Sequence, residues 1–473
     1  MNTCYKNVRL FSLISALILL LQLAACGGDS GTNNTHNKLQ VLVFSDIHFD
    51  PFYDPSLFPE LLAKDAGKWA SIFKTSSIST PSLWGSDTNY PLLVLALSGI
   101  KQNAKESPVI IFTGDILGHG LPLQFYEKTK GSPLNDADVA AMKAFIKKTV
   151  AFVLEQVRSS VGNIPVIFVL GNSDSYGDIE PPDSSFFSDT AELYYTEFLN
   201  GTVDHQTFIK TFTKGGYYAA EPAGTKLMVI GLNTYEFSPL FKDKYTEEVN
   251  AQLTWLDTTL DLAQAKGKKV WLLMHVPPCA DKYSTAQSVD ADGHISTATM
   301  MWNQDYQKHF LQILSKYPGL ITQTFIAHTH MDEYRMMSPG NPAVTTPSIA
   351  PYFGNNPAFK VFTFSRAALK ATDYTSLNCD LAITPSQFNR YYTFSMAYLM
   401  QGYLNDSLSL LYSELVTNSA MQQLYRGSYF SGHNYSDPVG NEYYPITDKT
   451  WPVYWCGIGH MDEQELIDCV NSY

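Results

Sequence analysis

The stretch LQVLVFSDIH, residues 39–48, decides the fold class of this chain. Its first part is nearly all apolar, which is typical of a buried strand, and its last part carries Asp46 and His48. Five similar apolar runs follow, at residues 109–112, 166–170, 227–230, 270–274 and 321–326. Apolar residues at helical spacing lie between them, over residues 139–157 and 253–260. Strands that alternate with helices predict an α/β fold.

Side chains that can bind metal follow five of these six runs. They are Asp46, His48, Asp115, Asn172, His275, His328 and His330. In α/β sheets the carboxyl ends of the strands meet along one edge, and ligands bind there. Imidazole and carboxylate groups together suit Zn, Mn or Fe. Each motif alone is a weak signal, and Gly-Asp and Gly-Asn-x-Asp are common in turns, but their joint placement predicts a metal site at this edge.

The composition excludes two classes of protein. The 473 residues include 32 Lys+Arg and 45 Asp+Glu, a formal net charge of −13, so binding of a nucleic-acid polymer is not expected. Hydrophobic residues make up 45% and charged residues 16%, which excludes a disordered chain. The length suggests about three domains, although one large α/β domain is also possible.

The pattern changes at about residue 367. Residues 387–429 are rich in Tyr, Leu, Met and Ser, and they are expected to be mostly helical. We therefore divide the chain into a catalytic domain over residues 38–366 and a mainly helical C-terminal subdomain over residues 367–473.

The N-terminus has the features of an export signal. Lys6 and Arg9 precede a short apolar run, at residues 10–25, that is too short for a comfortable membrane span.

The run ends LAAC, residues 23–26, which resembles the lipobox of bacterial lipoproteins. That resemblance implies removal of residues 1–25, acylation of Cys26 and a lipid anchor in the cell envelope. Gly27 stands where an Asp would imply retention in the inner membrane, so the outer membrane of a Gram-negative cell is expected. An ordinary cleaved signal with a chance cysteine is the alternative. Residues 26–37 are small and polar and are predicted to form a flexible tether.

Four cysteines remain for the folded part of an exported chain. Cys456 and Cys469 are close in sequence and are expected to form a disulfide. A second pair between Cys279 and Cys379 is possible.

The order of the motifs resembles that of the calcineurin-like metallophosphoesterases. Their order is Asp-x-His, Gly-Asp, Gly-Asn-His-Asp/Glu, a lone His, and Gly-His-x-His. The resemblance implies a β-sandwich flanked by helices, with two divalent metal ions, expected to be Zn²⁺, that clamp a phosphoryl group and activate water. It implies seven ligands, with Asp115 bridging: Asp46, His48 and His330 for one ion, and Asn172, His275 and His328 for the other.

Longer motifs resemble the acid sphingomyelinase-like phosphodiesterases in particular. They are GDILGH at 114–119, HVPP at 275–278, WN at 302–303, HTHMDE at 328–333, PSI at 347–349 and NPAFKVF at 356–362. The spacing of Cys456 and Cys469 resembles the C-terminal disulfide of that group. The resemblance implies hydrolysis of a phosphodiester or phosphoanhydride, with nucleotides or other soluble phosphate esters as substrates. Sphingomyelin, with its phospholipid head group, is the alternative substrate.

The chain departs from the family pattern in three places. Ser173 replaces the family's usual histidine after Asn172, so we expect His119 to serve as the general acid. Ala327 replaces the glycine before His328. The Cys-rich lipid-extracting domain of full acid sphingomyelinases is not expected, because only residues 27–37 lie between Cys26 and the first strand.

Two other readings differ in class. A purple acid phosphatase needs a Tyr three residues after the bridging Asp, where this chain has Gly118, so that class is rejected. The second alternative is a catalytically weak surface lipoprotein that uses the fold only for binding. The complete set of metal-binding side chains argues against it, and Ser173 argues slightly for it.

Overall fold

The computed structural model describes residues 37–473 except 130–134, 178–179, 200, 338–340 and 434–445. The predicted signal, the lipidation site Cys26 and the tether up to residue 36 lie outside the described residues. Residues 39–473 form one unit. Within the described residues, no helix combines the length and the apolar character that a membrane crossing needs.

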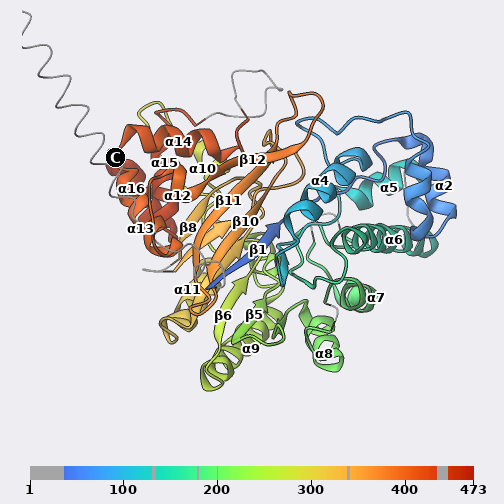
Figure 1. The fold of residues 1–473 in the computed structure, drawn as a ribbon, viewed down its shortest axis with the longest axis horizontal. Coiled ribbons are helices and arrows are strands. Elements are labelled where there is room, and N and C mark those ends of the chain that lie inside the picture. The colour runs from blue at the N-terminus through green and yellow to red at the C-terminus, as the bar shows by residue number, and fades with distance from the viewer. Residues whose placement is uncertain (1–36, 130–134, 178–179, 200, 338–340, 434–445) are drawn as a thin grey trace, which may run out of the picture. The chain divides into compact units, whose positions relative to one another are not determined.

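Two six-stranded sheets form the centre of the fold (Figure 1). The first has the order β12-β11-β10-β1-β2-β3: β12 (Phe388–Thr393), β11 (Ala371–Cys379), β10 (Ala358–Ser365), β1 (Lys38–Phe44), β2 (Ile110–Phe112) and β3 (Val166–Phe168). The second has the order β4-β5-β6-β7-β9-β8: β4 (Tyr218–Ala220), β5 (Leu227–Gly231), β6 (Lys269–Leu273), β7 (Ile321–Ile326), β9 (Pro342–Thr345) and β8 (Tyr334–Met336). All six predicted apolar runs are strands.

The two sheets pack face to face, as the β-sandwich prediction requires. The ring of Trp271 in β6 lies 4.3 Å from that of Phe364 in β10, and Phe325 in β7 lies 5.2 Å from Phe362. Alternate residues of β6 point the other way: Val270 and Leu272 belong to a second core with helices α9 (Thr246–Ala265) and α11 (Gln304–Ser315). Strands buried on both faces explain the unbroken apolar runs of the sequence.

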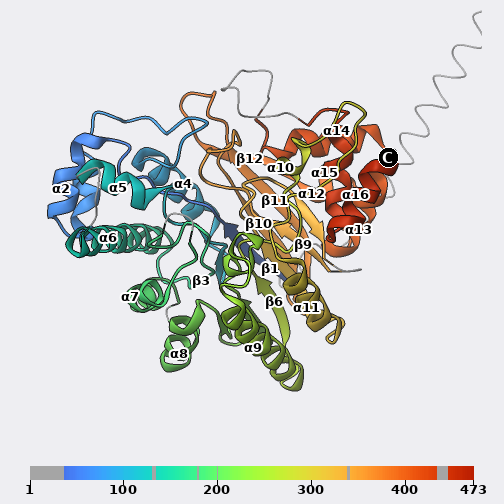
Figure 2. The ribbon, with the colours of Figure 1, turned by 180° about the vertical axis from the view of Figure 1, so that it is seen from behind.

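Helices cover the outer faces of the sandwich (Figures 1 and 2). The longer ones are α4 (Tyr90–Asn103), α6 (Asp136–Val161), α7 (Ser184–Tyr194), α8 (His205–Gly215), α9 (Thr246–Ala265) and α11 (Gln304–Ser315). Short helices lie in the loops: α2 (Phe58–Ala63), α3 (Trp69–Phe73), α5 (Leu121–Thr129) and α10 (Lys282–Ala286). The C-terminal helices are α12 (Phe394–Ala397), α13 (Leu404–Glu414), α14 (Ser419–Tyr429), α15 (Trp451–Gly459) and α16 (Glu463–Ser472).

The C-terminal part differs from the prediction at its beginning. Residues 388–393 were expected to be helical, but they form β12, which pairs with β11. β11 in turn pairs with β10, so the expected boundary at residue 366 falls in the turn between two paired strands of one sheet. The reason is cross-strand pairing: Tyr374 and Thr375 of β11 contact Tyr392 and Thr393 of β12, and such pairs stabilise strands of aromatic and β-branched residues. Helix prevails from Phe394 onward.

The predicted disulfide between Cys456 and Cys469 is present and joins α15 to α16. The possible second pair is not formed, because Cys279 and Cys379 are both free and buried.

Candidate metal centre

The predicted site residues meet at one edge of the two sheets. β1, β2 and β3 are parallel, and Phe44, Phe112 and Phe168 are paired in register at their ends. β6 and β7 are parallel in the second sheet, which brings His275 next to the segment of His328 and His330. The carboxyl ends of these five strands therefore bring all seven predicted ligands together, as the sequence predicts.

Asp115 lies between histidines from both sheets. Its Oδ2 is 3.3 Å from Nε2 of His48 and 3.0 Å from Nε2 of His275. The same nitrogen of His275 is 3.1 Å from Oδ1 of Asn172, and the ring of His275 lies 5.3 Å from that of His328. One carboxylate thus reaches both predicted ligand sets.

Asp46 occupies the other side of the site. Its Oδ1 is 3.5 Å from Nε2 of His330, 3.8 Å from Nε2 of His48 and 4.0 Å from Nε2 of His275. The Nε2 atoms of His48 and His330 are only 3.1 Å apart. Because two ring nitrogens at that distance can share at most one proton, at least one of them presents a lone pair.

The hydrogen bonds of the rings direct Nε2 toward the centre. Nδ1 of His48 is 3.0 Å from the carbonyl oxygen of Leu117, and Nδ1 of His275 is 2.7 Å from that of Thr113. A carbonyl oxygen only accepts, so Nδ1 carries a proton in both rings, and Nε2 is the nitrogen that faces the carboxylates and is placed to bind a metal in exchange for its own proton. Both carboxylate oxygens of Asp46 are buried without a hydrogen-bond partner among the described residues. Such groups need a cation, so this donor set fits metal ions.

We call Asp46, His48, Asp115, His275 and His330 the inner cluster, since each is at most 1% exposed. Burial and charge act on it together. Burial disfavours a charged His48, but the carboxylates of Asp115 and Asp46 prevail and raise its pKa to about 9; Asp115 raises the pKa of His275 to about 9 in the same way. Burial also favours a neutral Asp115, yet His275 and His48 hold the pKa of that carboxyl well below its usual range. Asp115 is therefore charged at neutral pH, which suits a metal ligand.

The backbone of the site is strained. Five of the predicted ligands have left-handed φ angles: Asp46 (49°), His48 (43°), Asp115 (62°), His328 (74°) and His330 (65°). Each such residue costs on the order of 1–3 kcal/mol and persists where the surroundings enforce it, which is common at functional sites. Gly171 is required beside them, because a Cβ atom there would collide with the carboxylate of Asp115.

His119 lies at the rim of the site and is 27% exposed. Its ring is stacked between those of His48, at 4.0 Å, and Tyr352, at 4.1 Å. Asp87 holds it with both carboxylate oxygens: Oδ1 is 2.7 Å from Nδ1, and Oδ2 accepts from the backbone N–H at 2.7 Å. We call Asp87 and His119 the rim pair. The sequence places Asp87 in a loop before the second strand, which either flanks the substrate or is a plain loop, and it gives no sign of the contact with His119.

Asp174 also has a role that the sequence did not reveal. Its carboxylate accepts from the backbone N–H groups of Asp115 (3.0 Å), Ile116 (2.8 Å) and Gly171 (2.9 Å). It therefore fixes the two loops that carry Asp115 and Asn172. Ser173 contributes through its backbone N–H, which donates to Oδ1 of Asp115 at 2.7 Å, so the histidine usual in the family is not needed for that contact.

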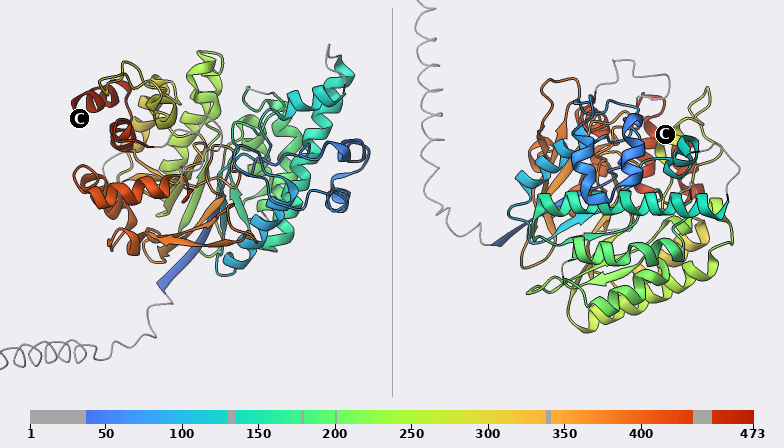
Figure 3. Two further views of the ribbon diagram at one scale, coloured as in Figure 1. Left: turned by 90° about the horizontal axis from the view of Figure 1, so that it is seen from above. Right: turned by 90° about the vertical axis from the view of Figure 1, so that its right-hand side faces the viewer.

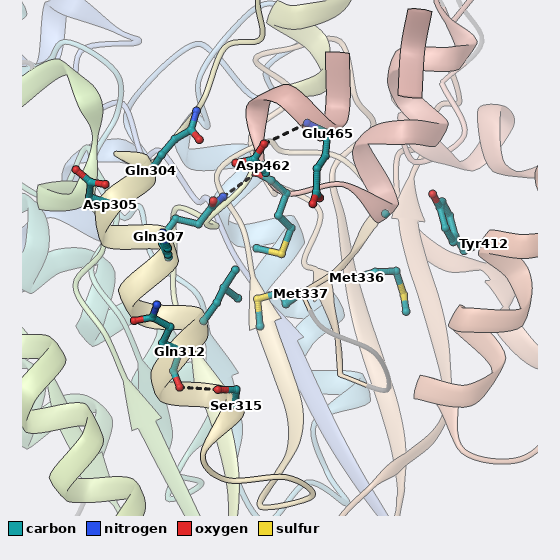
Figure 4. Close-up of a pocket in the computed structure, with 14 residues that line it drawn as sticks. Gln304, Asp305, Gln307, Gln312, Ser315, Met336, Met337, Tyr412, Asp462 and Glu465 are labelled. Carbon is teal, nitrogen blue, oxygen red and sulfur yellow. Dashed lines mark hydrogen bonds between the residues drawn. The ribbon is translucent and has the colours of Figure 1, made fainter. Parts of the chain in front are cut away.

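A cavity of about 300 Å³ opens onto the site. Asp115, Asn172, His328 and His330 line one side, next to His119. Asp281, Tyr283, Ser284, Met331 and Phe353 line the rest. A larger cavity of about 840 Å³ lies elsewhere, between α11 and the α15–α16 region (Figure 4). None of the predicted site residues lines that larger cavity, so the chemistry belongs to the smaller one.

Buried charges behind the cavity fasten the C-terminal helices to the metal-site loop. Glu333 accepts from Thr329, which lies between His328 and His330, at 2.7 Å. It also pairs with Lys282 at 2.5 Å and with Arg335 at 3.1 Å. Arg335 donates to the carbonyl oxygen of Gly457 in α15 at 2.8 Å. The C-terminal helices therefore help to fix the loop that carries two predicted ligands.

The fold and the site together define a metal-dependent hydrolase of phosphate esters. The family model "Calcineurin-like phosphoesterase" matches residues 39–332, and this chain belongs to that family. The match ends two residues after His330 and so covers every predicted ligand.

Curated relatives are similar over nearly the whole chain. "Sphingomyelinase phosphodiesterase D" of Dictyostelium discoideum is 24% identical over 88% of this chain and 93% of its own length. "Cyclic GMP-AMP phosphodiesterase SMPDL3A" of Rattus norvegicus is 26% identical over 91% of each. "Acid sphingomyelinase-like phosphodiesterase 3b" of Homo sapiens is 23% identical over 72% of this chain and 71% of its own length. The resemblance to acid sphingomyelinase-like phosphodiesterases is thereby confirmed.

Proposed function

We propose that this chain is an exported phosphodiesterase with two divalent ions, Zn²⁺ in the first instance. Asp46, His48 and His330 would hold one ion, Asn172, His275 and His328 the other, and Asp115 would bridge them. Two such ions would supply Lewis-acid activation of a phosphoryl group and a strong nucleophile derived from water at neutral pH.

The observation that carries this proposal is the position of Asp115. Its Oδ2 lies within 3.3 Å of one histidine from each proposed ligand set. A carboxylate with two oxygens is suited to join two cations at such a point. The N–H donor of Ser173 and the brace of Asp174 keep its orientation fixed.

The chain's own residues supply the remaining chemistry. His119 opens onto the cavity beside the inner cluster, where a leaving group would depart. Asp87 is placed to hold the proton on Nδ1 or to orient the ring, so that Nε2 faces the substrate. We assign to His119 the donation of a proton to the leaving oxygen.

Nucleotides or other soluble phosphate esters are the proposed substrates, and sphingomyelin is the alternative. The names of the relatives support both, since one is a cyclic GMP-AMP phosphodiesterase and another a sphingomyelinase. Phe353 and Tyr283 give the cavity aromatic surfaces on which a base could stack. Purified protein should be assayed against cyclic dinucleotides, nucleoside polyphosphates and detergent-dispersed sphingomyelin under the same conditions.

Metal content tests the dinuclear centre directly. Protein stripped with a chelator and reconstituted should contain about two ions per chain by elemental analysis. One ion, or none, would contradict the proposed centre. Two ions with no turnover on any phosphodiester would favour the alternative of a weak, ligand-binding lipoprotein.

We further propose that Cys26 is acylated and anchors the protein in the cell envelope, at the outer membrane if the cell is Gram-negative. The LAAC motif at residues 23–26 supports this. Radiolabelled palmitate should enter the wild-type protein and the matched control Cys4→Ser, but not Cys26→Ser. Equal labelling of all three would exclude the lipobox.

A further inference from the structure

The edge of the sheets opposite the metal centre is formed by the amino ends of the parallel strands. We call it the entry edge. Leu39 of β1, Leu227 of β5 and Leu369 of the β10–β11 turn line one cavity there. Nε1 of Trp271 in β6 donates to the carbonyl oxygen of Leu369 at 2.9 Å, which ties that turn to the second sheet. Both sheets therefore end together at this edge.

Basic residues gather at the entry edge. Lys226 precedes β5, Lys269 begins β6, and Arg366 and Lys370 lie in the β10–β11 turn. Lys226 and Arg366 are exposed. The nearby Glu221 is already paired with Lys266 at 3.1 Å and Lys268 at 2.9 Å. In a chain with a formal net charge of −13 this is a local positive surface.

The entry edge and the metal centre lie at opposite ends of β1. β1 is the blue strand that begins at the periphery of the molecule and runs inward in Figure 3. It ends at Phe44, and Asp46 of the metal centre follows two residues later. Its seven residues span roughly 23 Å at the usual rise of a strand. The folded unit therefore begins, at Leu39, on the side away from the metal centre.

We propose that the entry edge docks on a bilayer of anionic phospholipid and turns the metal centre toward the aqueous phase. An extended chain of a dozen residues, the number from Cys26 to residue 37, spans at most about 40 Å, so a lipid at Cys26 would keep the folded unit close to the bilayer. Attraction of Lys226, Lys269, Arg366 and Lys370 to lipid phosphates fixes the orientation. The consequence deepens the proposed function: the accessible substrates are soluble phosphate esters, and phospholipids of the supporting bilayer are out of reach.

Binding to vesicles tests the docking without the acyl chain. The full chain with Cys26→Ser should sediment with vesicles of phosphatidylcholine and phosphatidylglycerol in equal parts, less so at high salt, and weakly with phosphatidylcholine alone. Neutralising Lys226, Arg366 and Lys370 together to Gln should weaken binding about a hundredfold, since each basic residue contributes about fivefold.

The matched control carries Lys64→Gln, Lys68→Gln and Lys74→Gln, three exposed lysines around α2 and α3 that follow the catalytic end of β1. It should bind like the parent. Equal losses in both triple variants, or equal binding to both kinds of vesicle, would overturn the docking edge.

The orientation of the metal centre relative to the bilayer is tested on protein that is attached to vesicles. The full chain with Cys4→Ser is coupled through Cys26 to a maleimide lipid in vesicles that also contain phosphatidylglycerol and sphingomyelin; Cys279 and Cys379 are buried and do not compete. Coupled protein should hydrolyse soluble bis(4-nitrophenyl) phosphate as fast as free protein and leave the vesicle sphingomyelin intact. Faster hydrolysis of vesicle sphingomyelin after coupling would overturn the orientation. Failure of free and coupled protein alike on the soluble ester would instead refute the proposed activity, while the sedimentation results would still decide the docking.

Discussion

The inner cluster and the rim pair are neighbours with opposite physical properties. Every residue of the inner cluster is at most 1% exposed, and most of its ligands have strained backbones. His119 is 27% exposed, has no left-handed backbone angle, and its Nδ1 lies 2.7 Å from the carboxylate of Asp87. A rigid, dry set of donors suits the holding of cations, whereas an accessible imidazole on a fixed support suits proton transfer. The difference supports the proposal that metal binding and leaving-group chemistry belong to separate parts of one site.

Breaking the inner cluster at Asp115 should have the largest effect. Asp115→Asn removes the charge that lies next to both His48 and His275, and it should weaken both of the proposed ions at once. We expect loss of both metals and a rate reduction beyond the roughly 10²–10⁴-fold that general acids contribute. Elemental analysis and steady-state rates measure this. Asp257→Asn, in a remote surface ion pair with Lys316, is the matched control and should keep metal and rate. Retention of two ions by Asp115→Asn would show that Asp115 does not bridge.

Removing the imidazole of the rim pair should spare the metals. An alkoxide or nucleoside leaving group needs a proton, so His119→Ala should reduce its departure by about 10²–10⁴-fold. A nitrophenolate leaves without a proton, so the rate on a nitrophenyl ester should fall far less. Nitrogen atoms of His119, His48 and His330 lie within 4.8 Å of one another, so metal content must be measured as well. Equal losses for both leaving groups, or a loss of metal, would make His119 a ligand or a structural residue.

Weakening the support of the rim pair should cost less than removing its imidazole. Asp87→Asn keeps the size of the side chain but loses the charge that binds Nδ1 and the N–H of His119. We expect a loss of about ten- to hundredfold, the usual range for partners that orient a functional histidine, again confined to poor leaving groups. The double variant with His119→Ala should be no slower than His119→Ala alone. Additive rate losses in the double variant would show that Asp87 acts independently of His119.

The sequence was sufficient for the inner cluster and insufficient for its surroundings, for a physical reason. Ligands at strand ends are marked by the apolar runs before them, and parallel pairing brings those ends together whatever the loops do. Asp87 and Asp174 act through contacts with backbone groups at distant or irregular positions, which leave no periodic signal. The error at residues 388–393 has a similar origin, because β12 exists through its pairing with β11 and not through a local pattern.

Adding an imidazole at residue 173 should have the smallest effect and sharpens the comparison most. The side chain of Ser173 is half-buried, and its backbone N–H, not its hydroxyl, holds Asp115. Ser173→His should therefore leave metal content unchanged and place a second imidazole at the rim, with a rate increase of a few-fold on alkyl leaving groups only. Ser173→Asn is the control, because it adds a polar group of intermediate size without a titratable nitrogen. If the added histidine also restores part of the rate lost in His119→Ala, the rim is a place where any well-positioned imidazole serves as the acid. If both substitutions instead lower the metal content, the loop at Asn172 belongs to the rigid, metal-binding part of the site. His119 would then be the one imidazole position at the rim that can be changed without affecting the metals.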